Sequence, residues 1–284
     1  MKRKLLLLAV LLLVAGLILS WIVGGALISP YRSEVGEAPQ DLPIEAVRLP
    51  SESGATLAVW HLRASESNGV VCLFHGIRSD RRALLERAEW LLSLGYSSVM
   101  VDLCAHGEST GEQVTLGYRE SHDVLAAVQY AREEHPDEAV GVIAISLGGA
   151  AALFAAPLGV DALVVESVFS DLRPAIENRV RSFLGPLYWI PTQLLLVQVE
   201  PRLSVSLDEL RPMDRVSRVQ SPILFLGGEA DPFTPPAEIQ AMYGAASEPK
   251  EIAFFAGVPH HDLESSARPE YRQSVGAFLS KFMR

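Results

Sequence analysis

The sequence predicts an α/β fold built around a largely parallel β-sheet with helices on both faces. The prediction rests on short apolar runs that alternate with stretches of helical spacing from residue 44 to the end of the chain. Such alternation is typical of βαβ units, in which each helix connects two parallel strands. Residues 171–220 contain no strand pattern. They predict an inserted helical cap at about 173–220, because such long connections are uncommon in compact domains.

Eight segments have the pattern of strands. Residues 44–49 and 55–62 flank a turn-forming segment and predict an antiparallel pair at one edge of the sheet. Short continuous apolar runs, typical of strands buried on both faces, follow at 70–74, 98–101, 140–145, 162–165, 223–226 and 252–255. Helical spacing is found at 83–94, 122–134, 149–156, 236–246 and 270–282.

Residues 1–30 are expected to form a membrane anchor. Residues 5–28 are a run of 24 residues without a charge, and three basic residues precede it. A helix of that length spans the ~30 Å hydrocarbon core of a bilayer. The positive-inside rule then places the N-terminus in the cytoplasm and the rest of the chain on the outer, periplasmic or extracellular side. A cleaved signal peptide, which would leave a secreted domain, is the alternative.

The remaining composition indicates a tether and one main domain. Residues 31–42 are polar and contain Pro and Gly, as tethers do, and residues 43–284 are expected to form the domain. The formal net charge of the chain is −10, so nucleic acid, which requires a clustered basic face, is not an expected partner. Cys72 and Cys104 are too few for a disulfide framework, and neighbouring parallel strands would hold them too far apart to pair. We expect two free thiols.

The segment AISLGG at 144–149 gives the strongest indication of chemistry, because it places Ser146 between an expected strand and a helix of small residues. A sharp turn there lifts the hydroxyl clear of the sheet and requires small residues two positions before and after it, which Ala144 and Gly148 are. A serine that only caps the helix would give the same pattern. The segment resembles the nucleophile elbow of the α/β-hydrolase superfamily, G-x-S-x-G, with alanine in place of the first glycine.

The resemblance implies that an acid and then a histidine follow the serine, each just after a strand. GGEADPFTPP at 227–236 and AGVPHHDL at 256–263 resemble the acid and histidine loops of the superfamily, and they contain Asp231 and His260. In such a triad, the histidine takes the proton of the serine and the carboxylate orients the histidine. We therefore expect Ser146 as nucleophile, His260 as general base and Asp231 as acid. Glu166, at the end of another expected strand, is the alternative acid.

The same resemblance implies an oxyanion hole made of two backbone N–H groups. Leu147 follows the nucleophile, and Ile77 belongs to an HGI segment that resembles the H-G-x motif of the superfamily. DLCAHGEST at 102–110 resembles the D-x-R-G-H-G-x-S loop, so Asp102, His106 and Ser109 are expected to have structural roles.

These residues predict a serine hydrolase that needs no cofactor and no metal. The expected reaction is ester hydrolysis through an acyl-enzyme on Ser146. The apolar segment 183–197, expected to cover the site or to form a buried core helix, and the membrane anchor favour a carboxylesterase or lipase-like enzyme acting on small or lipid-like acyl esters. A serine peptidase or an acyl thioesterase is the alternative enzyme. A non-catalytic binding protein of the same fold is the alternative of another class, and the three filled triad positions argue against it.

Overall fold

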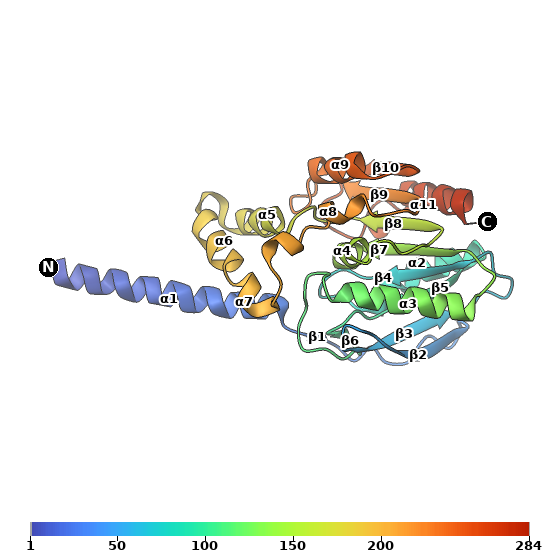
Figure 1. Ribbon diagram of the computed structural model, residues 1–284, viewed down its shortest axis with the longest axis horizontal. Coiled ribbons are helices and arrows are strands. Elements are labelled where there is room, and N and C mark those ends of the chain that lie inside the picture. The colour runs from blue at the N-terminus through green and yellow to red at the C-terminus, as the bar shows by residue number, and fades with distance from the viewer. Residues whose placement is uncertain (1, 284) are drawn as a thin grey trace.

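The computed structural model describes residues 2–283, apart from the side chains of residues 8, 9, 12 and 13. Within this part of the chain, eight strands form one sheet (Figure 1) in the order β10 (Lys250–Phe255), β9 (Ile223–Gly228), β8 (Ala162–Glu166), β7 (Val140–Ile145), β4 (Val70–Phe74), β5 (Ser97–Val101), β3 (Thr56–Leu62) and β2 (Ile44–Pro50). Strand β3 runs antiparallel to β5 and β2, and the other pairs are parallel. The predicted fold class and its antiparallel edge are confirmed.

Helices cover both faces of the sheet. The core on one face includes α3 (Glu120–Glu134), α4 (Leu147–Phe154) and α9 (Pro236–Ala245). The core on the other face includes the 3₁₀ helix η1 (Arg81–Leu84), α2 (Leu85–Ser93) and α11 (Arg268–Phe282), which follows the short α10 (Leu263–Ser266). These helices lie within a few residues of the expected ranges, because the apolar spacing that predicts a helix is also the face that packs on the sheet.

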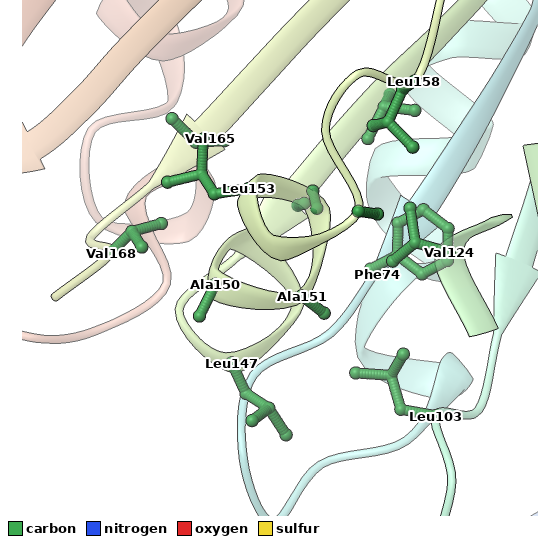
Figure 2. Close-up of a cluster of buried hydrophobic side chains, with 14 of the residues drawn as sticks. Phe74, Leu103, Val124, Leu147, Ala150, Ala151, Leu153, Leu158, Val165 and Val168 are labelled. Atoms are coloured by element: carbon green, nitrogen blue, oxygen red, sulfur yellow. The ribbon is translucent and has the colours of Figure 1, made fainter. Parts of the chain in front are cut away.

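The core around α4 is built from small side chains. Figure 2 shows Ala150 and Ala151 on this helix, with Phe74 at one side and Val168 at the other. All of them are buried. The alanines bring the helix backbone close to the sheet, so the beginning of α4 is held firmly where β7 ends.

A helical cap lies between β8 and β9, as expected. Its elements are α5 (Leu172–Leu184), the 3₁₀ helix η2 (Gly185–Leu187), α6 (Trp189–Leu196), α7 (Val199–Leu203), the 3₁₀ helix η3 (Leu207–Glu209) and α8 (Met213–Val216). Helix α5 begins at an N-cap, where Asp171 accepts a hydrogen bond from Arg173 N at 2.8 Å. Phe183 and Leu187 are 80% and 78% exposed, so the apolar segment of the cap is not a buried core helix.

The N-terminal helix α1 (Lys2–Ile28) extends away from the domain and passes beside the cap (Figure 1). In the part of the chain that the structure describes, no helix is long and apolar enough to cross a membrane.

The segment after α1 is bound to the domain over its first residues. Strand β1 (Tyr31–Arg32) pairs in parallel with β6 (His106–Gly107). Ser33 Oγ donates a hydrogen bond to Asp80 at 2.9 Å. The part of the expected tether that follows α1 is therefore held in place. Cys72 and Cys104 are both free, as predicted, and both are buried.

Candidate active site

Ser146 occupies a strained turn between β7 and α4. Its φ is 49° and its ψ is −103°, in a region of backbone space that residues other than glycine rarely adopt. Ser146 N donates to Glu166 O at 2.8 Å, and Ser146 O accepts from Ala150 N at 2.9 Å. These two bonds tie the serine backbone to β8 and to the first turn of α4, so the surrounding structure maintains the strained conformation.

The glycines after Ser146 are required by close packing. A Cβ atom on Gly148 would lie 2.7 Å from Phe74 Cβ and 2.9 Å from Phe74 O at the end of β4. A Cβ atom on Gly149 would overlap the Val168 side chain and lie 3.0 Å from Ala144 O. The small residues that the elbow pattern requires therefore have a direct steric reason here.

Asp231 and His260 meet on the loops that follow β9 and β10. His260 Nδ1 lies 2.6 Å from Asp231 Oδ2. The other carboxylate oxygen of Asp231 accepts hydrogen bonds from Phe233 N at 2.8 Å and from Thr234 N at 2.9 Å. The Asp231 side chain is fully buried, and the Phe233 ring packs edge-on against the His260 ring at 5.3 Å. The carboxylate is thus fixed, and it leaves His260 Nε2 as the ring nitrogen available to a substrate or a serine.

Strand polarity places these groups at one edge of the sheet. The strands β7, β9 and β10 are mutually parallel through β8, and Ser146, Asp231 and His260 follow their carboxyl ends. Among the described residues, no hydrogen bond joins Ser146 Oγ to His260. Catalytic hydrogen bonds of this kind often become short only when substrate is bound.

The predicted oxyanion donors lie next to the serine. Ile77, Ser146 and Leu147 line one pocket of ≈ 310 Å³. A Cβ atom on Gly76 would lie 3.7 Å from Ser146 Cβ, so the loop that carries Ile77 approaches the serine closely. Neither Ile77 N nor Leu147 N donates to an acceptor of the described chain. Both N–H groups remain available to an oxygen in the pocket.

The loop that carries Ile77 is held by a neutral histidine. His75 Nε2 accepts a hydrogen bond from Leu103 N at 3.1 Å, and His75 Nδ1 donates to Gly76 O at 2.7 Å. One ring nitrogen can accept a hydrogen bond while the other donates one only if the imidazole is uncharged. Burial lowers the pKa of His75 to about 4, which agrees with this tautomer. His75 thus positions the loop.

Residues 102–110 form a fixed loop at the same edge of the sheet. The buried Asp102 forms an ion pair with Arg81 and accepts a hydrogen bond from Glu108 N at 2.9 Å. Ser109 Oγ donates to Asp102 O at 2.6 Å, and His106 Nδ1 bonds a carbonyl oxygen within the loop at 2.9 Å. The side chains of Asp102, His106 and Ser109 are engaged in holding the loop.

Glu166 belongs to a buried polar network behind the serine. Its carboxylate accepts hydrogen bonds from Tyr271 Oη at 2.5 Å and from Arg87 Nη2 at 3.3 Å. Arg87 also bonds Asp262, two residues beyond His260, at 3.2 Å. Burial raises the pKa of Glu166 to about 7. The network links β8 to the histidine loop, and none of the hydrogen bonds of the described residues joins Glu166 to His260.

The pocket also contains residues that the sequence patterns did not indicate. Gly24, Leu27 and Ile28 of α1 line it together with Arg179 of α5 and Leu195 of the cap. Their part in the site depends on contacts between segments far apart in the chain, which leave no local pattern in the sequence. In the described chain, no group of three or more His, Cys, Asp or Glu side chains is arranged to hold a metal ion.

The sheet topology, the elbow and the cap define an α/β hydrolase. Residues 65–211, just over half of the chain, match the family described as serine aminopeptidase, S33. The chain therefore belongs to this family of hydrolases. The matched region includes Ile77 and Ser146 and ends before Asp231 and His260.

Several known proteins are similar to this chain over most of its length. Uncharacterized protein YqkD of Bacillus subtilis is 21% identical, over 87% of this chain and 82% of its own length. Uncharacterized protein Rv2307c of Mycobacterium tuberculosis is 27% identical, over 83% of this chain and 77% of its own length. The structure of the Pyrococcus furiosus esterase Pf2001 superimposes with a TM-score of 0.76 at 22% identity, over 91% of this chain and 99% of the esterase. At that identity the likeness establishes the fold.

Proposed function

We propose that this chain is a carboxylesterase that cleaves acyl esters through an acyl-enzyme on Ser146. One observation carries the proposal: a serine in a strained elbow lines an apolar pocket, and the buried Asp231 is hydrogen-bonded to the half-buried His260 at the same edge of the sheet. The esterases among the structures with the same fold are consistent with it.

In the proposed reaction, Ser146 Oγ attacks the ester carbonyl carbon while His260 Nε2 accepts its proton. Asp231 accepts the hydrogen bond from Nδ1 and stabilises the imidazolium that forms. The N–H groups of Ile77 and Leu147 bind the oxyanion. Collapse of the tetrahedral intermediate expels the alcohol, which takes the proton from His260. A water molecule, deprotonated by His260, then attacks the carbonyl carbon of the acyl-enzyme. Collapse of this second intermediate breaks the bond to Ser146 Oγ, which takes the proton back from His260, and releases the carboxylic acid.

The lining of the pocket favours acyl substrates over aminoacyl substrates. An aminopeptidase must bind the ammonium group of its substrate, which requires a carboxylate or several acceptor oxygens. Among the described residues, no Asp or Glu side chain lines the pocket, whereas Arg78, Arg179 and Arg202 do. The remaining lining is mainly apolar. These arginines repel an ammonium group, and the apolar walls fit an acyl chain. An acyl thioester fits the same walls, so a thioesterase is the second candidate.

We further propose that the enzyme works at a lipid surface. Helix α1 and the cap lie side by side and expose large apolar side chains, among them Leu6 at 67%, Phe183 at 80% and Leu187 at 78%. Exposed apolar patches of this kind mark sites of contact with membranes or other proteins. A lipid surface would cover both elements and would concentrate acyl esters near the pocket.

Replacement of Ser146 by alanine tests the nucleophile. We expect Ser146→Ala to lower kcat for a short activated ester by about 10⁴–10⁶, because the acyl-enzyme cannot form without the serine oxygen. A fluorophosphonate should label the wild type at Ser146 and leave the variant unlabelled. Ser247→Ala is the matched control, because Ser247 is exposed on the loop between α9 and β10 and should leave both results unchanged.

The same preparations distinguish the reaction classes. The wild type is assayed on acyl esters, acyl thioesters and aminoacyl amides of matched chain length. Esters should be hydrolysed fastest and aminoacyl amides slowest. A wild-type protein that neither turns over the panel nor reacts with the fluorophosphonate would be a binding protein. Ester turnover that survives in Ser146→Ala would refute Ser146 as the nucleophile.

A further inference from the structure

The N-terminal helix supplies one wall of the catalytic pocket. Gly24, Leu27 and Ile28 of its last two turns line the pocket that also contains Ser146 and Leu147. Leu195, Val199 and Leu203 of the cap line the same pocket. The helix that leads away from the domain therefore ends within contact of the space in which the substrate binds.

Helix α1 is fitted closely against α7 of the cap. A Cβ atom on Gly24 would lie 2.5 Å from Gln198 Oε1, and one on Gly25 would lie 3.1 Å from Arg202 Nη1. The Arg202 guanidinium also stacks on the Trp21 ring at 3.9 Å and donates a hydrogen bond to Trp21 O. Two adjacent glycines leave room for the Gln198 and Arg202 side chains, which a larger residue at either position would displace.

The end of α1 is also bound to the catalytic domain. The last carbonyl groups of a helix have no partner within the helix. Here Ala26 O accepts a hydrogen bond from Arg78 Nη2 at 2.9 Å, and Ile28 O accepts one from Val114 N at 2.9 Å. Arg78 directly follows Ile77, the proposed oxyanion donor. The helix end is thereby fixed relative to both the cap and the oxyanion loop.

We propose that the last turns of α1, residues 24–28, determine which acyl chains the pocket accepts, with Leu27 as the main specificity-determining residue. The inference rests on the proposed esterase function. An acyl chain attached to Ser146 extends into the apolar part of the pocket, which Leu27 lines together with Val199 and Leu203. The side chain at position 27 then limits the room available to the distal carbons, and it does not touch the reacting atoms.

The test uses the full-length protein with a larger and a smaller side chain at position 27. Leu27→Trp and Leu27→Ala are assayed on p-nitrophenyl esters from acetate to palmitate in detergent micelles. Leu17→Trp and Leu17→Ala are the matched controls, because Leu17 lies on the same helix outside the pocket and is 47% exposed, against 45% for Leu27.

We expect Leu27→Trp to lower kcat/KM for the longer esters about tenfold relative to acetate, as filling an apolar pocket typically does. Leu27→Ala should move the preferred ester toward longer chains. The two Leu17 variants should keep the wild-type profile. The ratio of labelling rates by long-chain and short-chain alkyl fluorophosphonates should change in the same direction, because labelling also requires the chain to enter the pocket.

The outcomes separate the two proposals. A wild type that hydrolyses esters, with a chain-length profile that the Leu27 and Leu17 variants share, overturns the role of α1 and leaves the esterase proposal standing. A wild type without activity on any ester of the series overturns both. If Leu27→Trp also loses acetate hydrolysis, the chain-length profile of Leu27→Ala tests the inference instead. A profile equal to that of the wild type would then contradict it.

Discussion

Ser146 is held in a backbone conformation that costs about 1–3 kcal/mol for a residue with a side chain. Its φ of 49° is maintained by hydrogen bonds to Glu166 O and from Ala150 N. The elbow pattern could be found from the sequence because the small residues around the turn are local. The reason for them, the approach of Phe74 and Val168, became visible only in the structure.

Two carboxylates close to the site make different contacts, and this difference predicts their roles. Asp231 bonds His260 Nδ1, whereas Glu166 bonds Tyr271 and Arg87. Asp231→Asn should lower kcat by about 10⁴, because the amide favours the wrong tautomer of the histidine. Glu166→Gln should have a much smaller effect on kcat.

The measurement is kcat on a short activated ester, with the melting temperature of each variant as the control for folding. Glu166→Gln should lower the melting temperature, because it disturbs a buried ion pair with Arg87. If Glu166→Gln instead had the lower kcat of the two variants, Glu166 would be the catalytic acid and the role proposed for Asp231 would be wrong.

At the scale of the element, α4 lies so close to β4 that one added methyl group between them should lower the stability of the fold. Gly148→Ala should destabilise the fold by about 1–3 kcal/mol, since the new Cβ atom meets Phe74 Cβ and Phe74 O. Gly244→Ala on α9 is the matched control, because nothing lies within 4 Å of its Cβ position. That variant should be neutral or more stable, by up to about 1 kcal/mol. Urea unfolding measures the stability of both variants. Equal stabilities of Gly148→Ala and Gly244→Ala would contradict the steric explanation.

At the scale of the whole molecule, local patterns predicted the sheet and its covering helices almost to the residue. Each of these elements has an apolar face whose period is visible within its own sequence. The position of α1 was not predictable in this way. Its apolar residues gave no sign that Leu27 would line the pocket of Ser146, and nothing local indicated that Tyr31 would pair with His106. Tyr31 and His106 are 75 positions apart in the chain, and Leu27 and Ser146 are 119 apart.

The exposed apolar surface of α1 and the cap gives a prediction for the molecule in the cell. Full-length protein should remain with the membrane pellet after a high-salt wash and be released by detergent, because apolar contacts are not weakened by salt. Leu6→Glu with Phe183→Glu should move it to the supernatant, whereas Leu94→Glu, a control on another exposed leucine, should not. Wild-type protein found in the supernatant as a dimer would show instead that a second copy covers this surface.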